Sequence, residues 1–277
     1  MPYQKAKIIW DIFILVAIIW YFVILPLEIS FYFDWEDDFS HYIEKKGIKS
    51  EIAHFFVFLP EFIIIIDTVL KLITGYYENG VVIKSKLKII HHYFHKSFFF
   101  DLIAYMPLIL HNFLKNEESE SEANLSLLKF LQLLMFFKIP RVQTVLNNFQ
   151  EIMTLKGKND YIINILILGF KLIFFTHIIA CIWHAFSFFS DPSMNITWID
   201  INSLRGSPWF ERYAHSMFWS AGCVFAIGGN ENSGPNNNSE FMLAVFIYLA
   251  SGFFYAFSIN MIREFFIDVN KKNRVYK

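Results

Sequence analysis

The sequence predicts an all-α membrane protein with six transmembrane helices, built as a four-helix bundle followed by a two-helix pore domain with a re-entrant pore helix. Three observations support this fold class. First, 55% of the 277 residues are hydrophobic and 19% are aromatic, more apolar surface than a soluble domain of this size could bury. Second, the apolar residues form stretches of about bilayer length. Third, a shorter and more polar segment, 209–228, ends at Gly228-Gly229 and precedes the last stretch.

Six apolar stretches are near the length that a helix needs to cross a bilayer. They cover residues 12–27, 52–77, 97–113, 125–149, 161–189 and 241–267. The first follows Lys5 and Lys7, as a signal peptide would, but Asp11 interrupts its start and no small-residue cleavage site follows. We therefore expect an uncleaved spanning helix there. The expected domains are a four-helix domain at 1–149, a linker at 150–159, a pore domain at 160–268 and a tail at 269–277.

Lysine-rich loops predict the orientation, because cytoplasmic loops carry an excess of Lys and Arg. Lysines crowd the second-to-third connection, the fourth-to-fifth connection and the end of the chain: Lys84, Lys86, Lys88, Lys96, Lys156, Lys158, Lys271, Lys272 and Lys277. This distribution predicts a multi-pass protein with both termini in the cytosol. The three N-glycosylation sequons then fall in loops on the opposite side of the membrane, at Asn124, Asn195 and Asn237.

Charged residues inside the predicted spans should be paired, since a lone ion at the bilayer centre costs at least ~2.5 kcal/mol. On the fourth span, cations hold three of five positions in a stripe that recurs every third residue: Lys129, Gln132, Met135, Lys138 and Arg141. Acidic partners are available on the other three spans: Asp11, Glu61, Asp67 and Asp101. Two interpretations stay open. Either Lys129, Lys138 and Arg141 sense voltage, or Lys138 and Arg141 extend to the cytosolic interface beside Pro140.

The segment 209–228 is too polar and too short to cross the membrane, which suits a half-helix that enters and turns back. A cation filter needs consecutive backbone carbonyls that face a narrow axis, and residues that tolerate positive φ provide them. The candidate selectivity filter and pore mouth consist of Ala226, Ile227, Gly228, Gly229, Asn230 and Glu231. Glu231 could form an acidic ring at the outer mouth. On these residues alone, an ordinary Gly-Asn turn is the favoured interpretation.

Other classes of function find less support. The net charge is −1 and the basic residues are dispersed, which argues against a nucleic-acid partner. His91-His92-x-x-His95 suggests a membrane-embedded metal enzyme as a remote alternative, but the other histidines form no second box and neighbouring lysines would repel a metal. A basic interfacial loop is the simpler interpretation of that segment. We expect no enzymatic activity, no metal and no cofactor beyond permeant monovalent cations.

Residues along the whole chain carry a family resemblance. They include Trp10-Asp11 with Pro26, Asp67 with Thr74-Gly75-Tyr76-Tyr77, Phe100-Asp101-Leu102-Ile103 with Pro107, His177, Ala180-Cys181, Trp183, Tyr213, Ser216, Phe218-Trp219-Ser220, Glu240, Gly252 and Ser258-Ile259-Asn260. In this order and spacing, the chain resembles the superfamily of voltage-gated-like channels that contains the ether-à-go-go, hyperpolarisation-activated and cyclic-nucleotide-gated families. The resemblance implies that residues 1–149 are voltage-sensor-like.

The resemblance further implies a pore-forming subunit of a tetrameric cation channel in the plasma membrane, selective for potassium or non-selective among monovalent cations. The family's potassium filter, Thr-Val-Gly-Tyr-Gly, is replaced here by Ala226, Ile227, Gly228, Gly229 and Asn230. This loss puts a rigid potassium filter in doubt. It motivates an alternative, a silent or regulatory subunit that assembles with related channel subunits. No cyclic-nucleotide domain follows the sixth stretch, so gating by cyclic nucleotides is not expected.

Overall fold

The computed structural model describes residues 5–31, 50–78, 81–114, 130–155, 160–190, 196–228 and 233–275. The chain divides into two compact units. The first consists of Met1–Leu25 and Asp34–Glu151, and the second of Pro26–Phe33 and Ile152–Lys277. The first helix, α1 (Lys5–Phe31), contributes to both, and the division falls at Pro26 inside it. A proline within a helix removes one backbone hydrogen bond, so this is a natural point of weakness.

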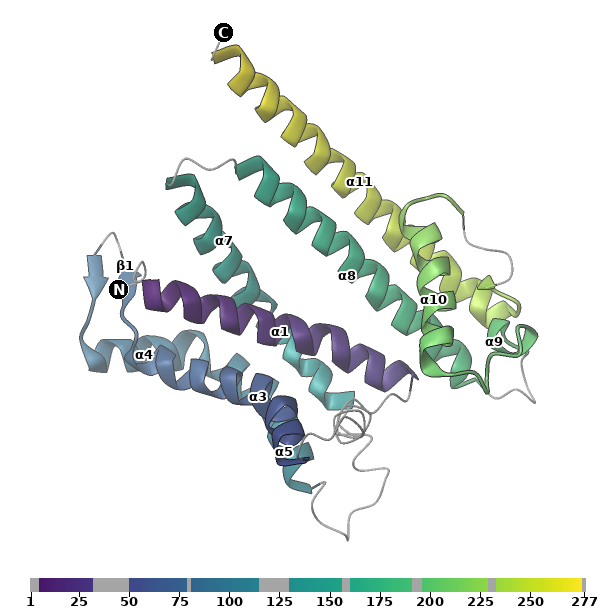
Figure 1. Cartoon of the computed structure of the whole chain (residues 1–277), viewed down its shortest axis with the longest axis horizontal. Coiled ribbons are helices and arrows are strands. Elements are labelled where there is room, and N and C mark those ends of the chain that lie inside the picture. Colours follow the sequence, from purple (N-terminus) through teal and green to yellow (C-terminus); the bar gives the residue numbers. More distant parts are fainter. Residues whose placement is uncertain are drawn as a thin grey trace. The chain divides into compact units, whose positions relative to one another are not determined.

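The described residues of the first unit are helical apart from one small β-hairpin and short connections (Figure 1). After α1 come α3 (Ser50–Ile73), the antiparallel strands β1 (Tyr76–Glu78) and β2 (Val81–Ile83), and α4 (Lys86–Lys96). The chain continues through α5 (Phe98–Leu114), the 3-10 helix η1 (Gln132–Lys138) and α7 (Ile139–Leu155). The histidine-bearing segment expected as a loop is therefore the helix α4, whose buried residues are Ile89 and Tyr93.

The 3-10 geometry of η1 explains the three-residue repeat of the fourth stretch. A 3-10 helix has 3.0 residues per turn, so side chains at i and i+3 lie directly above one another. Gln132, Met135 and Lys138 are the buried residues of η1, and all three belong to that repeat. In an α-helix the same positions would drift around the axis by about 60° at each step. At Ile139 the chain returns to α-helix, with Pro140 in the first turn, where a missing N–H costs little.

Apolar contacts hold the helices of the first unit together. Phe22 of α1 stacks on Phe136 of η1, with ring centroids 4.8 Å apart. Met135 is fully buried, as is Ala104 of α5. Tyr105 of α5 donates a hydrogen bond to the carbonyl oxygen of Ile64 in α3, at 3.5 Å. These contacts tie α1, α3, α5 and η1 into one bundle.

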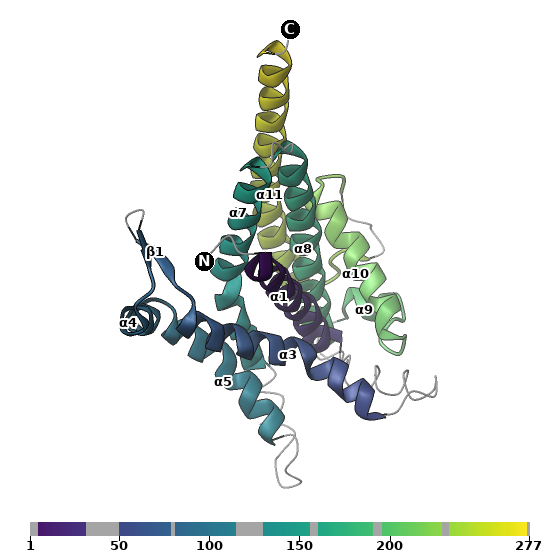
Figure 2. The same cartoon turned by 60° about the vertical axis from the view of Figure 1, so that its left-hand side comes forward.

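The second unit contains α8 (Asp160–Phe188), α9 (Trp198–Ile201), α10 (Trp209–Val224) and α11 (Asn238–Val275). Both views show α10 lying against α8 (Figures 1 and 2), and α10 also contacts α11. Three buried tryptophans form the centre of the core. Trp183 stacks on Trp219 with centroids 3.9 Å apart and on Trp198 at 6.4 Å.

Length and composition identify three of the described helices as able to cross a membrane: α1 over Lys7–Phe31, α8 over Ile163–Phe188 and α11 over Asn238–Ile267. A shorter apolar stretch, Phe98–Pro107, lies in α5. The other predicted crossings fall on α3, on α5 and on η1 with α7, and they stay predictions. By contrast, α10 has 16 residues and is about 24 Å long, which is shorter than the ~30 Å hydrocarbon core.

Candidate functional site

A buried carboxylate at the start of α5 collects two cations and a hydroxyl. Asp101 is 4% exposed. Its Oδ2 accepts hydrogen bonds from Lys71 Nζ at 3.1 Å and from the Tyr93 hydroxyl at 3.0 Å. Its Oδ1 pairs with Nζ of Lys138, the last residue of η1, which is 3% exposed. The Lys138 ammonium also lies 4.0 Å from the centre of the Tyr105 ring, a cation–π contact.

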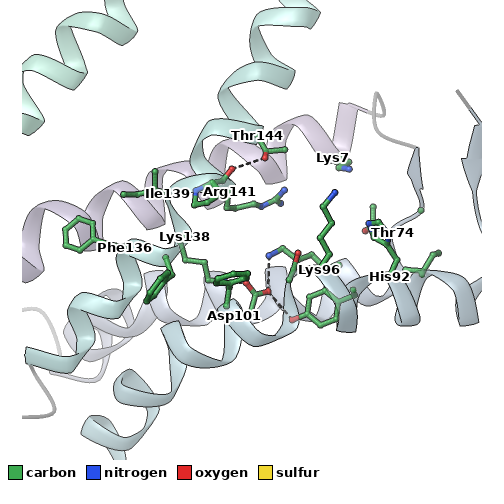
Figure 3. A pocket seen from close by; sticks show the side chains of 18 residues that line it. Lys7, Thr74, His92, Lys96, Asp101, Phe136, Lys138, Ile139, Arg141 and Thr144 are labelled. Atoms are coloured by element: carbon green, nitrogen blue, oxygen red, sulfur yellow. Dashed lines mark hydrogen bonds and ion pairs between the residues drawn. The ribbon is translucent and has the colours of Figure 1, made fainter. Parts of the chain in front are cut away.

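A second group of charges lies one turn further along the same stripe. Arg141 Nη2 is 2.9 Å from Asp67 Oδ1 and 3.2 Å from Asp11 Oδ1. Asp67 also contacts Lys71 Nζ at 3.6 Å, and Trp10 Nε1 donates to it at 3.4 Å. Figure 3 shows Lys138 beside Asp101, with dashed lines at the Asp101 carboxylate, while Arg141 lies farther along the chain near Thr144. Because Lys71 contacts both Asp67 and Asp101, it joins the two groups into one network.

The network balances its charge: three cations, Lys71, Lys138 and Arg141, meet three carboxylates, Asp11, Asp67 and Asp101. Pairing of this kind is what allows ions to stay inside a membrane-spanning bundle. Of the residues singled out in the sequence, the structure thus brings together Lys138 and Arg141 with three of their four expected partners. Lys129 and the side chain of Glu61 lie outside the described residues.

Two members of the network, Lys71 and Tyr93, were not identified from the sequence. Lys71 follows Asp67 by four residues on α3, and that spacing alone places both on one helix face. The spacing could therefore have identified it. Tyr93 had no comparable signal, because a chain with 13 tyrosines and 34 phenylalanines offers too many aromatic candidates.

The second candidate site lies where α10 ends. The N–H of Ile227 donates to the carbonyl of Gly222 at 3.1 Å and the N–H of Ala226 to that of Cys223 at 3.3 Å. These two bonds form a Schellman motif, which requires a left-handed residue at its turn. Ala226 takes that position with φ 54°, and Gly228 follows with φ 96°. The chain therefore reverses sharply here. Gly229, Asn230 and Glu231 lie outside the described residues.

Buried polar contacts hold this hairpin against α8 and α11. The carboxylate of Glu240, which is completely buried, accepts hydrogen bonds from Ser187 Oγ at 2.6 Å and from the backbone N–H groups of Trp198 and Asn236. Trp183 Nε1 donates to the carbonyl of Ser233 at 3.2 Å. These bonds attach both ends of the segment around α10 to the long helices, so the turn after α10 has a fixed base.

The loop between α8 and α10 has its own ion pair. Arg205 Nε and Nη2 donate to the two oxygens of Asp200 at 2.7 and 3.2 Å, while Thr197 donates to Asp200 from its hydroxyl and its N–H. The hydrogen bond from Arg205, followed by those from Thr197, lowers the pKa of Asp200 from its ordinary 3.8 to about 2. This loop is therefore stabilised by a carboxylate that stays ionised.

The end of α1 belongs to this second unit through its backbone. His184 Nδ1 donates to the carbonyl oxygen of Ser30 at 2.7 Å, and Arg212 Nη2 donates to that of Phe31 at 3.2 Å. The last carbonyls of a helix lack partners within it and carry partial negative charge, so a buried guanidinium is a favourable partner. Arg212 thus fastens the last turn of α1 to α10.

The remaining predicted sites have simpler surroundings. Asn237 precedes α11, where its Oδ1 accepts from the N–H of Glu240 and its Nδ2 donates to the carbonyl of Ile196. Asn124 and Asn195 lie outside the described residues. The rings of His91 and His95 stack 4.5 Å apart, and the described part of the chain holds no group of three or more potential metal ligands. Both cysteines are free and buried.

Comparison with known proteins bears on both sites. The family model described as "Ion transport protein" matches residues 7–274, which is nearly the whole chain. The chain belongs to the ion transport protein family. Together with its helical structure, this makes it an all-α membrane protein, and both candidate sites lie within the matched region.

Three relatives of this ion transport protein share the printed name voltage-gated inwardly rectifying potassium channel. KCNH2 of Rattus norvegicus is 26% identical over 270 residues, KCNH7 of Mus musculus 23% over 271 and KCNH6 of Gallus gallus 25% over 272. Each alignment covers 92% of this chain and 21–22% of the relative. The chain thus spans about a fifth of the length of these curated relatives.

Proposed function

We propose that this chain is a pore-forming subunit of a tetrameric cation channel of the voltage-gated potassium-channel type. Membership of the ion transport protein family and the names of the relatives support this class. The finer features of the proposal are six membrane crossings, a voltage-sensor-like domain at 1–149, a pore domain at 160–268, cytosolic termini and residence in the plasma membrane.

The observation that carries the proposal is the short helix α10 with its sharp turn. It is too short to cross a bilayer, it packs between two helices that are long enough, and it ends in consecutive tight turns at Ala226 and Gly228. Irregular backbone at membrane depth is tolerated only where protein shields it or where it lines water. A re-entrant pore helix followed by a filter at Ala226–Glu231 satisfies this condition, with monovalent cations as the permeant ions.

The exposed surface of a single chain supports assembly. Along α11, large apolar side chains stay open to the surroundings, among them Phe253, 80% exposed, and Phe246, 64% exposed. Such a surface requires lipid or protein neighbours. One chain alone encloses no axis, whereas four copies related by rotation would place four filters around one.

The buried ion-pair network supports the sensing part of the proposal. If Lys129, Lys138 and Arg141 crossed the whole field in each of four subunits, the electrical work would be roughly 28 kcal/mol per 100 mV, at ~2.3 kcal/mol per charge. Lys138 pairs with Asp101, and Arg141 pairs with Asp11 and Asp67, so two of these cations have carboxylate partners at successive turns of the stripe. Glu61 would be a further partner. The same geometry also suits cations that merely stay paired, so the sensing role needs its own test.

Recording currents from the chain expressed alone tests the proposal. We expect a cation current whose reversal potential follows the cation gradient when external sodium is exchanged for potassium. The competing proposal, a silent or regulatory subunit, is favoured by the missing filter threonine and tyrosine. It requires no current from the lone chain and altered currents when the chain is co-expressed with a related conducting subunit. An expressed chain that reaches the cell surface but carries no current would contradict the pore-forming role.

A further inference from the structure

The last part of α11 carries two oppositely charged residues inside a segment that is apolar enough to cross a membrane. The candidate span runs over Asn238–Ile267, and Arg263 and Glu264 lie near its end. Large apolar side chains on either side of them are exposed, among them Ile262, 39% exposed, and Phe266, 58% exposed. Ions in such surroundings need partners of opposite charge.

The helix itself does not supply these partners. Side chains three or four residues apart share a helix face, whereas neighbours in sequence point about 100° apart. Arg263 and Glu264 therefore do not face each other. No acidic residue stands three or four places from Arg263, and no basic residue stands three or four places from Glu264. Within the described ranges, neither residue takes part in an ion pair.

The two charges lie on the surface of α11 that α8 leaves uncovered. Phe254 of α11 stacks on Phe175 of α8, with ring centroids 4.1 Å apart. At about 100° per residue, the face that contains Phe254 continues to Met261. Arg263 lies almost opposite this face, and Glu264 lies about 100° to one side of Arg263. Figures 1 and 2 both show the last turns of α11 extending beyond the start of α8.

We propose that this end of α11 is an interface between copies of the chain, in which Arg263 of each subunit pairs with Glu264 of the neighbouring subunit. The inference rests on the proposed tetramer and adds a specific contact to it. Subunits related by a four-fold rotation meet through heterologous interfaces, where one side of a subunit contacts the other side of the next. A cation and an anion on different sides of one helix satisfy such an interface four times, and the ring closes with every charge paired.

The carboxylate of this pair is already positioned within the single chain. Asn260 Nδ2, one turn earlier on α11, donates a hydrogen bond to Glu264 Oε1 at 3.1 Å. The other carboxylate oxygen can then accept from a guanidinium of the neighbouring subunit. Four such pairs would draw the ends of the α11 helices together on the side that is expected to face the cytosol. The ring would therefore favour a narrow cytosolic mouth.

Disulfide cross-linking of the full chain tests the proximity of the two positions. Two differently tagged variants, Arg263→Cys and Glu264→Cys, are expressed together and their membranes are treated with a mild oxidant. We expect linked dimers that carry both tags, because each interface would bring the two positions together. Met261→Cys expressed with Glu264→Cys is the matched control, since Met261 lies on the α8 face and should give no such dimers. The two native cysteines are buried.

Charge exchange tests the pairing itself. We expect Arg263→Glu and Glu264→Arg each to shift the equilibrium from tetramer towards monomer by about tenfold, because four partly exposed pairs are lost together. The double variant should restore the tetramer, since every pair is re-formed with its charges exchanged. Gel filtration with light scattering in detergent measures the tetramer fraction. An Arg263 that merely extended to the aqueous interface would gain nothing from the second exchange.

The outcomes separate this inference from the proposed assembly. Mixed dimers together with recovery in the double variant would support the pairing. A tetramer of the unchanged chain that gives no mixed dimers, or a double variant as impaired as the single ones, would overturn the pairing and leave the tetramer in place. An unchanged chain that is monomeric would contradict the proposed assembly and the pairing together.

Discussion

Asp101 shows how far the contacts of a single residue could be predicted from the sequence. The cost of an isolated ion in a bilayer predicted that Asp11, Asp67 and Asp101 would have cationic partners, and the structure pairs each of them with a lysine or arginine. The choice of partner was not predictable, because it depends on which side chains the packing of separate helices brings together. Tyr93 contacts Asp101 across the junction of α4 and α5, which meet at Ser97.

Breaking the Asp101–Lys138 pair should destabilise the first unit. We expect Asp101→Asn to lower the free energy of unfolding by about 3 kcal/mol, because Lys138 would be left buried beside a neutral amide. The double variant with Lys138→Gln should be less destabilised than the two single effects combined, since neither charge then remains. Thermal unfolding in detergent measures this. Glu211→Gln, at an exposed carboxylate of α10, is the control; additive effects would disprove the pairing.

The Asp200–Arg205 pair should make the loop between α8 and α10 sensitive to acid. Since the pKa of Asp200 is lowered in the folded state to about 2, its stabilising effect is complete above the ordinary value of 3.8 and is lost as the pH falls towards 2. We expect Asp200→Asn to cost about 1 kcal/mol at neutral pH, and the difference from the unchanged protein to vanish at low pH. Hydrogen exchange of the loop amides across this pH range measures it. A difference independent of pH would contradict this role.

At the scale of secondary-structure elements, the positions of helices were predicted more fully than the contacts of single residues. Apolar length placed α8 at 161–189 and the structure has it at Asp160–Phe188, while the predicted half-helix from Trp209 is α10. The 3-10 form of η1 was not predicted, although the three-residue period of Gln132, Met135 and Lys138 was visible. Whether that period indicates a 3-10 helix depends on the backbone geometry, which a hydrophobic pattern does not determine. The left-handed Ala226 was equally hidden, because glycine is the residue that normally marks such a turn.

The same substitution, alanine to glycine, should have opposite effects on the stability of the protein inside α10 and in the turn that follows it. Ala226→Gly removes the strain of a left-handed alanine, so we expect a gain of up to about 1 kcal/mol in stability. Ala221→Gly, inside α10, should lose about 1 kcal/mol through helix propensity. Thermal midpoints of the two variants give the comparison. A loss of stability in both would indicate that Ala226 is not left-handed at this turn.

At the scale of the whole molecule, composition and apolar stretches predicted a membrane protein, and the family match confirms an ion transport protein. The assembly was beyond prediction from one chain, because a pore is formed between copies. The missing filter threonine and tyrosine likewise leave ion preference to experiment. In the account proposed here, the charged bundle of the first unit responds to voltage and the segment after α10 in the second unit lines the pore.

Neutralising Arg141 should reduce the voltage sensitivity of the channel. Removing one charge from each of four subunits removes up to roughly 9 kcal/mol of electrical work per 100 mV, so the activation curve should become shallower in Arg141→Gln. Lys86→Gln, an exposed position at the start of α4, is the matched control and should leave the slope unchanged. An unchanged slope in Arg141→Gln would assign this residue a structural role only.

The most direct test of the pore is the unit conductance of channels carrying Glu231→Gln, recorded at low and at high salt with Glu211→Gln as control. If the hairpin after α10 surrounds the permeation axis, four neutralised carboxylates at its mouth should lower cation conductance at low salt. The deficit should shrink at high salt, where screening acts over about 3 Å at 1 M. Equal conductance of Glu231→Gln and the unchanged channel at low salt would contradict a pore lined by this hairpin.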